Sequence, residues 1–440
     1  MSAGQGTGLG GAWGAVAETH TSVVYFAGDR AAKLKKPVDL GFVDFTGLEA
    51  RRAACVREVE LNRRFAPDVY LGVAALTDES GRALDHVVVM RRMPGDRRLA
   101  SLVAAGVPVD EPLHRVARLL AVWHAKAPRG PDIDRHGTCD ALRGRWADSF
   151  AQVRALPDGL ADRAGRDLDA IEELAMRYLA ARAPLFDDRV AAGRVVDGHG
   201  DLLADDIFCL DDGPRVLDCL EFDDGLRSLD GLDDAAFLAM DLERLGAAGL
   251  AERFLHWYVE FSGDPAPTTL WHHYVAYRAF VRAKVAFVRW AQGDPTALRS
   301  AAGTCELTLR HLRAGAVRLV LVGGLPGTGK STVAGRLADR FGMTVLGTDR
   351  LRKEAAGIGA DRPGDPEMYA PERVAAVYDA LLARAESLLV RGESVVLDAT
   401  WNARTARESA AALAGRTAAD LVQIRCAAPE DVAARRLACR

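Results

Sequence analysis

The 440-residue chain lacks the segments that mark secreted and membrane-spanning proteins. Its first residues, MSAGQGTGLGGAWG, contain neither a basic nor an apolar stretch, so a signal peptide is not expected and residues 1–17 are predicted to form a flexible tail. A run of about 18 apolar residues, as a transmembrane helix requires, is also missing. The seven cysteines are scattered and form no C-x-x-C pair, which argues against a disulfide framework or zinc site and favours the cytoplasm.

The chain also has no large excess of positive or negative charge. The net charge is −4, and only seven of the 57 basic residues are lysine. This balance provides no general attraction to nucleic acid or to an anionic membrane, so a nucleic-acid or membrane partner is not expected. The composition is that of an ordinary globular protein, and the length suffices for two or three domains. No oligomeric state is predicted.

The most specific motif is GLPGTGKS at residues 324–331, which matches the P-loop pattern G-x-x-x-x-G-K-[ST]. An apolar run precedes it and an amphipathic stretch follows it, as in a strand, a Gly-rich loop and a helix. Glycines allow backbone N–H groups to surround a polyphosphate, and the helix N-terminus adds a positive dipole end. Lys330 is expected on the β- and γ-phosphates, and Ser331 on Mg²⁺. The predicted ATP-binding residues are Gly324, Gly327, Thr328, Gly329, Lys330, Ser331 and Thr332.

Strand and helix patterns alternate strictly from residue 316 onward. Strands are predicted at 316–323, 344–348, 394–398 and 420–427, and helices at 330–341, 371–391, 403–415 and 429–438. Such alternation favours an α/β domain with a parallel sheet and crossover helices. We assign this P-loop domain to residues 315–440, and we expect it to be C-terminally incomplete because a lid, a further strand and a final helix would follow in a complete domain.

Three further residues of this domain are candidates for chemistry. Asp349 follows a strand, and Arg352 lies one helical turn later, so the acid could accept a hydroxyl proton and the arginine could hold an acceptor anion. Asp349 could instead be a helix N-cap. Asp398 ends another strand, as a Mg²⁺ partner of the P-loop does, although a turn residue is the alternative.

A second phosphate-chemistry pattern lies upstream, in HGDLLADDI (199–207) and RVLDCLEF (215–222). Phosphoryl transfer needs an acid to orient the acceptor, oxygen ligands for Mg²⁺ and a cation for the phosphates. Asp201 is the candidate base, and Asp206 and Asp218 are candidate metal ligands. Lys33 is the candidate phosphate clamp, held by Glu58. Lys35 remains an alternative to Lys33, because residues two apart on a strand share a face.

The segments around this pattern are rich in strands first and in helices later. Strands at 22–27 and 31–35 form a predicted hairpin, a helix is predicted at 46–65, and strands follow at 69–76 and 86–91. The segments 111–126, 141–183 and 233–315 are mostly helical by pattern, with breaks at 157–159 and 263–267. We therefore predict an α+β domain over residues 18–314, with a small β-rich lobe followed by a helical lobe.

The order of lysine, helix glutamate, HGD and a later aspartate resembles the aminoglycoside phosphotransferase and choline-kinase-like family, which has the protein-kinase fold. REVELNRRFAPDVYLGV, DCLEFDD and AFLAMDLERLG resemble more closely a two-domain bacterial family that joins such a domain to a P-loop kinase. The resemblance implies catalysis by Asp201 and Mg²⁺ binding by Asp206 and Asp218. Position 206 is usually Asn in the family, and no clean Gly-rich nucleotide loop precedes the hairpin here.

The C-terminal domain is similar to polynucleotide kinase, gluconate kinase and zeta-toxin-like kinases, which place an Asp and an Arg toward the acceptor and further arginines at a lid. Arg436 and Arg440 match the lid position. The chain is therefore predicted to be a kinase that uses ATP and Mg²⁺ to phosphorylate a hydroxyl of a small molecule. A nucleotide-sensing regulator, in which one domain binds ATP without turnover, is one alternative. A polynucleotide 5′-hydroxyl kinase is another, although basic and aromatic residues do not interleave near 344–362.

Overall fold

A computed structural model describes residues 15–19, 21–39, 44–156, 161–355, 357 and 370–438. By its contacts the chain divides into two compact units, one of residues 1–136 with 193–264 and the other of residues 137–192 with 265–440. The domain boundary predicted between residues 314 and 315 lies inside the second unit, immediately after a helix that ends at Ala314, and it remains a prediction.

The first unit begins with a five-stranded antiparallel sheet in the order β1-β2-β3-β5-β4. Its elements are β1 (Ala15–Glu18), β2 (Ser22–Ala27), β3 (Arg30–Lys35), α1 (Leu48–Asn62), β4 (Tyr70–Thr77) and β5 (Ala83–Arg91). Gly28 turns the β2–β3 hairpin with a φ of 56°, which glycine adopts without strain. The predicted hairpin and helix are confirmed.

The N-terminal tail was predicted too long. Residues 1–14 lie outside the described residues, but Ala15, Val16 and Ala17 pair with Phe26, Tyr25 and Val24 in β1. This segment therefore adds an edge strand to the sheet, in a hairpin with the adjacent strand β2.

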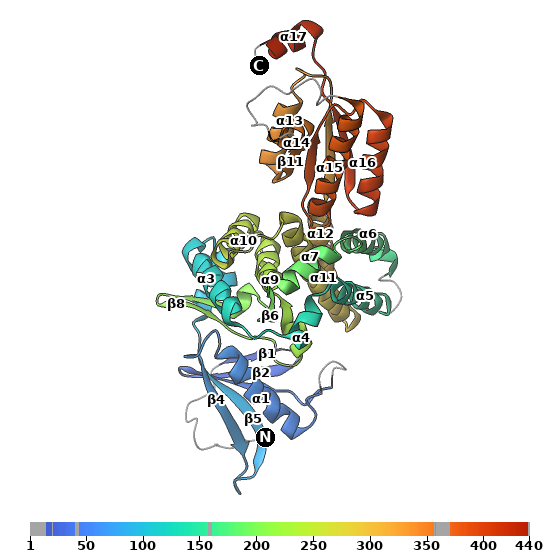
Figure 1. The fold of residues 1–440 in the computed structure, drawn as a ribbon. Helices are drawn as coiled ribbons and strands as arrows, with labels where there is room; N and C mark the ends of the chain where they lie inside the picture. Colours follow the sequence, from blue (N-terminus) through green and yellow to red (C-terminus); the bar gives the residue numbers. More distant parts are fainter. Residues whose placement is uncertain are drawn as a thin grey trace. The chain divides into compact units, whose positions relative to one another are not determined.

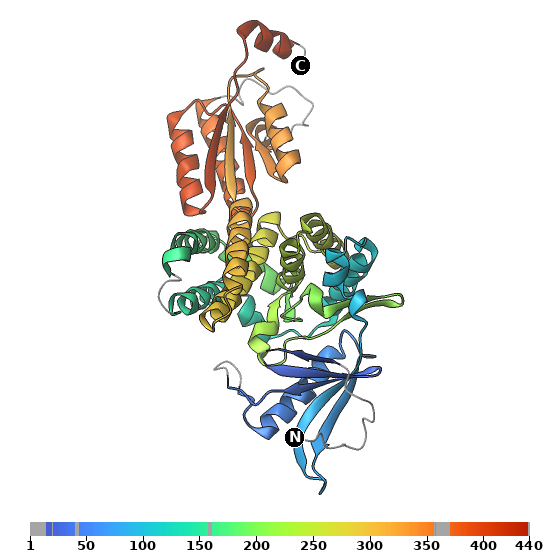
Figure 2. The same cartoon turned by 180° about the vertical axis from the view of Figure 1, so that it is seen from behind.

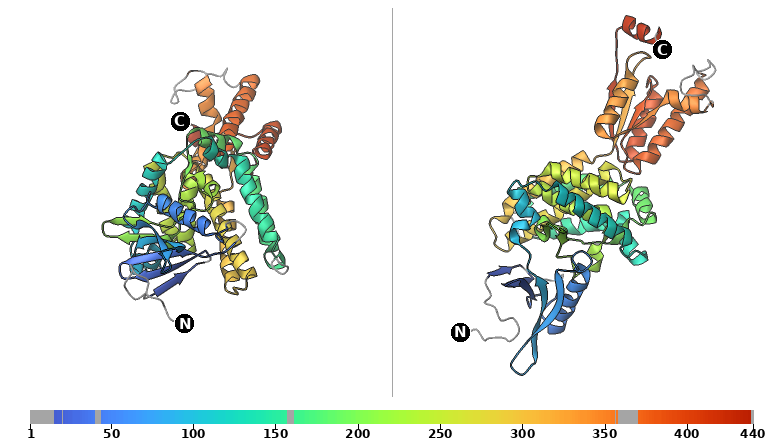
Figure 3. Two further views of the ribbon diagram at one scale, coloured as in Figure 1. Left: turned by 90° about the horizontal axis from the view of Figure 1, so that it is seen from below. Right: turned by 90° about the vertical axis from the view of Figure 1, so that its left-hand side faces the viewer.

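Helix α1 covers one face of this sheet, as the right-hand view of Figure 3 shows. Cys55 and Val59 of α1 pack with Ala31 of β3 and Val88 of β5 in one apolar cluster. Because side chains alternate along a strand, Lys33 and Lys35 lie on the same face of β3 as Ala31. Both lysines are consequently buried beneath α1.

The rest of the first unit is mainly helical, with two short antiparallel strand pairs, β6–β9 and β7–β8. Helix α9 is almost wholly buried and forms the centre of this part. The elements are α2 (Leu99–Ala104), α3 (Asp110–Lys126), α4 (Pro131–Asp134), β6 (Val195–Asp197), β7 (Ile207–Leu210), β8 (Gly213–Val216), α8 (Asp224–Arg227), β9 (Ser228–Asp230), α9 (Gly231–Arg244) and α10 (Ala248–Ser262). A β-rich part followed by a helical part is the predicted arrangement (Figure 1).

In the residues that the structure describes, the second unit contains five helices and the P-loop domain. The helices are α5 (Cys139–Arg154), α6 (Ala161–Leu179), α7 (Ala183–Ala191), α11 (Thr268–Ala291) and α12 (Ala297–Ala314). Two buried side chains join them to the P-loop domain: the Thr269 hydroxyl donates to the Gly392 carbonyl (2.6 Å), and Arg182 donates to the Thr417 carbonyl (2.7 Å). The P-loop domain is therefore packed against helices of the same unit.

The P-loop domain has the predicted parallel sheet, in the order β11-β12-β10-β13. Helix α13 lies on one side of this sheet and α15 and α16 lie on the other (Figures 1 and 2). The elements are β10 (Arg318–Gly323), α13 (Lys330–Phe341), β11 (Thr344–Gly347), α14 (Thr348–Ala355), α15 (Pro371–Leu389), β12 (Val395–Asp398), α16 (Arg404–Arg416), β13 (Asp420–Arg425) and α17 (Glu430–Ala438). Helix α14 was not among the helices predicted for this domain; only the spacing of Asp349 and Arg352 indicated a helical turn there.

Candidate functional site

The upstream candidate residues meet around Lys33. The Lys33 ammonium lies 2.9 Å from the Glu58 carboxylate and 2.5 Å from the Asp218 carboxylate. Burial opposes the charged form of Lys33, but the charges of Asp218 and Glu58 outweigh it and raise the lysine pKa well above its usual value. The same attraction, against the effect of burial, lowers the pKa of Asp218. Lys33 is therefore a permanent cation between two carboxylates.

Lys35 has a different set of partners. Its ammonium lies 2.6 Å from the other oxygen of Glu58 and forms a short ion pair with Glu221. The Lys35 side chain is about 1% exposed, so it is shielded from ligands, whereas Lys33 reaches the half-exposed carboxylate of Asp218. This geometry favours Lys33 over Lys35 as the phosphate clamp. Glu221 was not singled out from the sequence, although it stands in the DCLEFDD segment.

Three aspartates form the acidic side of this site. Burial and the nearby charges of Asp218 and Asp201 together raise the pKa of Asp206 well above its usual value. Carboxylates crowded in this way are the donor set that a hard divalent cation prefers, and Mg²⁺ commonly takes one or two carboxylates with phosphate and water. The residues thus fit Mg²⁺ held by Asp206 and Asp218. Within the described ranges, no group of three or more His, Cys, Asp or Glu side chains is arranged to hold a metal by itself.

Asp234 of α9 holds the loop that carries Asp201. Its carboxylate accepts hydrogen bonds from the backbone N–H groups of His199 (2.7 Å) and Gly200 (2.9 Å). The ring of His124 lies 3.1 Å from the same carboxylate, and Tyr258 lies 2.9 Å from the other ring nitrogen. His124 is therefore a buried structural residue, in agreement with its position on an amphipathic helix.

His199 joins this loop to the segment before Asp218. Its ring nitrogen Nε2 lies 3.0 Å from the carbonyl oxygen of Leu217. Burial lowers the pKa of His199, so the ring is neutral near pH 7 and can donate this hydrogen bond without carrying a charge. The hydrogen bond of His199 thus connects the loop of Asp201, the candidate base, to the segment of Asp218, a candidate metal ligand.

Two glycines of the P-loop lie so close to the backbone of other segments that a side chain would not fit. Gly324 and Gly327 have φ angles of 143° and 78°, in the range that favours glycine. A Cβ atom at Gly324 would lie 2.3 Å from the Cys426 carbonyl oxygen, and one at Gly327 would lie 2.5 Å from that of Ala433. Larger residues at these positions would displace the loop, so the glycines are required by the structure as well as by a phosphate.

Ser331 and Asp398 lie together as the P-loop pattern predicts. The Ser331 hydroxyl is 2.6 Å from an Asp398 carboxylate oxygen, which places both oxygens where one Mg²⁺ would contact them. The Lys330 ammonium is 2.9 Å from the Leu325 carbonyl oxygen, within the loop itself. Thr328 also closes the loop, since its hydroxyl donates to the same carbonyl at 2.7 Å.

Asp349 lies in the first turn of α14, inside the helix, with Arg352 on the same face. The Asp349 carboxylate is 3.7 Å from Arg352 and 3.2 Å from Lys353, and it is largely exposed. Lys353 was not predicted as part of this cluster, although it follows Asp349 at the i, i+4 spacing of a helix. Arg436 of α17 lies 3.3 Å from the Gly327 carbonyl oxygen, while Arg440 is outside the described residues.

A cavity of about 490 Å³ lies elsewhere in the second unit. Leu337, Met343, Val422 and Glu393 are among its lining residues, and none of the candidate site residues is. We assign no role to it. Among the described helices, none is both long and apolar enough to cross a bilayer.

Replacing Asp206 with asparagine is expected to raise the Mg²⁺ concentration needed for half-maximal activity while retaining activity, because an amide oxygen is a weaker ligand than a carboxylate. The same change removes a carboxyl group whose ionisation is opposed by burial and by Asp218 and Asp201, so it is expected to raise the melting temperature of the metal-free protein and to shrink the gain caused by Mg²⁺. Melting curves over a Mg²⁺ titration measure both effects, and an unchanged metal dependence would show that Asp206 is not a ligand.

A family model described as an AAA domain matches residues 319–440 of the chain. In solved structures, the chain is similar to a choline/ethanolamine kinase family protein from Mesorhizobium loti, with 17% identity, coverage of 70% of this chain and 94% of that one, and a TM-score of 0.43. It is similar also to an aminoglycoside 2′-phosphotransferase solved with GDP, with 15% identity, coverage of 68% and 93%, and a TM-score of 0.38. Similarity at these TM-scores does not establish a function.

Closer relatives are found in mycobacteria. An uncharacterized protein of Mycobacterium tuberculosis is 47% identical over 429 residues, which cover 97% of this chain and 86% of the relative. An uncharacterized protein of Mycobacterium bovis matches with the same identity and coverage. Identity at this level over nearly the whole chain extends across the kinase-like site, the P-loop and the helices between them. The chain therefore belongs to the family of these mycobacterial proteins.

Proposed function

We propose that the chain is an ATP-dependent phosphotransferase whose N-terminal domain phosphorylates a hydroxyl of a small molecule. The observation that carries the proposal is Lys33, held between Glu58 and Asp218 with Asp201 and Asp206 beside them. Phosphoryl transfer requires a fixed cation, metal-binding carboxylates and an acceptor-orienting acid in one place.

Each residue has a distinct task in this proposal. Asp201 would accept a hydrogen bond from the acceptor hydroxyl and take its proton as the bond to phosphorus forms. Lys33 would hold the phosphate oxygens, with Glu58 fixing its position. Asp206 and Asp218 would hold Mg²⁺, which when bound would neutralise charge on the transferred phosphoryl group.

The P-loop domain is proposed to bind a second ATP. Its support is the AAA-domain match together with the glycine geometry and the contact of Ser331 with Asp398. If this domain also transfers a phosphoryl group, Asp349 would receive the proton of the acceptor and Arg352 would hold an anionic part of it. The exposed Asp349 carboxylate leaves room for such an acceptor.

We also propose that the protein works in the cytoplasm. The cysteines that the structure describes, Cys55 to Cys426, are free, and most are buried. A reducing compartment maintains cysteines in this state.

A screen of acceptors tests the proposed activity. ADP formation is measured with the full chain, Mg²⁺ and ATP against pools of sugars, aminoglycosides, nucleosides and oligonucleotides. The proposal predicts that one small-molecule pool stimulates ADP formation in the wild type and not in Asp201→Asn. Stimulation by oligonucleotides that is lost in Lys330→Ala would instead favour a polynucleotide kinase, and no stimulation by any pool would favour a regulator.

A further inference from the structure

Asp218 has a backbone conformation that its residue type disfavours. Its φ angle is 63°, in the left-handed region where a Cβ atom crowds the following carbonyl. Such a conformation persists only where the surrounding structure specifies it more strongly than the strain opposes it. The contacts around Asp218 therefore indicate which residues hold the carboxylate in place.

Two buried side chains bind the backbone at this point. The Asp218 N–H donates to the Tyr70 hydroxyl (3.1 Å), and the Cys219 N–H donates to the Asn62 side-chain oxygen (2.8 Å). Asn62 is wholly buried, and its amide nitrogen donates to the Glu58 carbonyl oxygen at 2.9 Å. The Asn62 amide is thus oriented before any ligand arrives.

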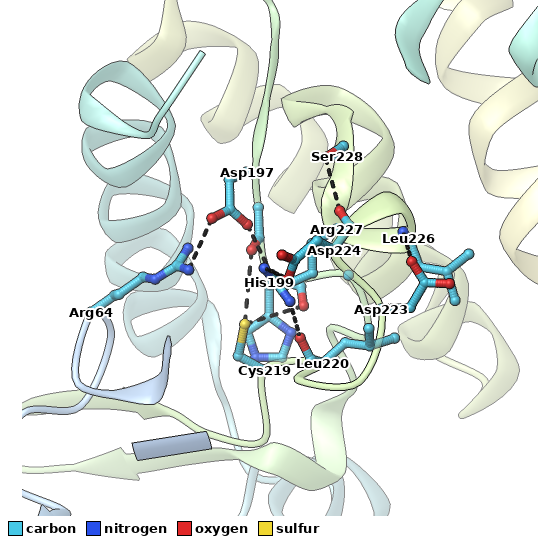
Figure 4. A network of polar contacts seen from close by, with 12 residues as sticks. Arg64, Asp197, His199, Cys219, Leu220, Asp223, Asp224, Leu226, Arg227 and Ser228 are labelled. Carbon is cyan, nitrogen blue, oxygen red and sulfur yellow. Dashed lines mark hydrogen bonds and ion pairs between the residues drawn. The ribbon is translucent and has the colours of Figure 1, made fainter. Parts of the chain in front are cut away.

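Arg227 fixes the segment that follows. Its guanidinium, about 1% exposed, donates to the Leu220 carbonyl (2.8 Å) and to the Asp197 carboxylate (2.8 Å). Arg64, in the turn that follows α1, donates to the other Asp197 oxygen at 2.9 Å. Figure 4 shows Asp197 between the two arginines, with His199, Cys219 and Leu220 next to them.

Helix α1 makes one more contact with the segment around Asp218. Arg57 of α1 lies 3.1 Å from Asp224, which also lies 2.5 Å from Arg227. The segments REVELNRR (57–64) and DCLEFDD (218–224), both singled out in the sequence, contact each other directly through Arg57 with Asp224 and Asn62 with the Cys219 N–H. Two further links are indirect: Glu58 and Asp218 both bind Lys33, and Asp197 joins Arg64 to Arg227, which binds the Leu220 carbonyl.

We propose that Asn62 is a positioning residue for the metal site, an inference that rests on the proposed phosphotransferase. Glu58 and Asn62 are four residues apart on α1 and lie on one face of the helix. Glu58 sets the position of Lys33, and Asn62 sets the backbone that directs Asp218 toward Lys33. One helix thus places the phosphate clamp and the metal carboxylate together, and Tyr70 supports the same backbone from β4.

Mn²⁺ binding tests this inference directly. Electron paramagnetic resonance follows free Mn²⁺ during titration of the full chain with a non-hydrolysable ATP analogue, in a Lys330→Ala background that weakens the P-loop site. Asn62→Leu keeps the side-chain size and removes the oxygen that accepts the Cys219 N–H. It is expected to weaken Mn²⁺ binding by about 10- to 100-fold, as loss of a partner that orients a metal ligand does.

A matched control separates positioning from stability. Val59→Ala truncates a buried side chain of the same helix, in the apolar cluster that Tyr70 and Leu217 also join, but it removes no hydrogen bond to the Asp218 segment. It should therefore lower the melting temperature and leave the Mn²⁺ affinity unchanged. Tyr70→Phe removes only the hydroxyl that accepts the Asp218 N–H, and it should weaken Mn²⁺ binding even if Asn62→Leu does not fold.

Unchanged Mn²⁺ affinity in folded Asn62→Leu, or in Tyr70→Phe when the former does not fold, would overturn the inference. Absence of nucleotide-dependent Mn²⁺ binding in the Lys330→Ala protein with Asn62 intact would instead count against the proposed function. The two failures are therefore distinguishable.

Discussion

Asp201→Asn is expected to lower phosphoryl transfer at the kinase-like site by about 10²- to 10⁴-fold, the contribution of a positioned general base. Asparagine keeps the shape of the side chain but cannot take the proton of the acceptor hydroxyl. Because the phosphates contact Lys33 and not Asp201 in our proposal, the affinity for ATP should change little.

The measurement is the single-turnover rate with the acceptor found in the screen, beside nucleotide affinity at the same Mg²⁺ concentration. Asp205→Asn is a suitable control, since Asp205 is an exposed neighbour on the same loop whose carboxylate lies 3.6 Å from Arg98. It should keep the wild-type rate. A rate for Asp201→Asn within a few-fold of wild type would remove Asp201 from its assigned role.

Lys330→Ala is expected to weaken nucleotide binding at the P-loop by about 2–5 kcal/mol, the cost of removing one partner from a hydrogen-bonded charge pair. The variant loses the cation that faces the β- and γ-phosphates, while the glycine-shaped backbone remains. A fluorescent ATP analogue titrated into the full chain reports the loss, provided that the kinase-like site is measured separately. Unchanged affinity would contradict the assignment.

The same variant tests whether the two sites act independently. Each site has its own cation and its own metal-binding acids, so we expect transfer at the kinase-like site to continue in Lys330→Ala. If the P-loop instead gates the first domain, transfer should fall in this variant as well, because coupling between two binding sites is reciprocal. Loss of transfer at saturating ATP, with an unchanged melting curve, would establish gating.

The P-loop and its sheet could be predicted from the sequence because they are local. The octet at 324–331 stands between an adjacent strand and an adjacent helix, and all four predicted strands of this domain form the parallel sheet. The contact of Ser331 with Asp398 followed from the P-loop pattern, in which an acid at the end of another strand is the partner of Mg²⁺.

The kinase-like site was predictable only in part. The alternation of β3 places Lys33 and Lys35 on one face. Their different roles depend on contacts with Asp218 and Glu221, which lie 185 and 186 residues further along the chain. Asn62 and Asp234 were not predicted for the same reason, because each accepts a hydrogen bond from a backbone N–H group that is distant in the sequence. Neither has a local pattern that distinguishes it from other polar residues on a helix.

The number of nucleotides bound per chain tests the central claim most directly. Calorimetric titration of the full chain with a non-hydrolysable ATP analogue and Mg²⁺ should give two sites in the wild type. One site should remain in Lys330→Ala, and one, the P-loop, in Lys33→Met, which removes the other phosphate cation. A single site in the wild type that disappears in Lys330→Ala would contradict the claim that the chain has two separate sites for ATP.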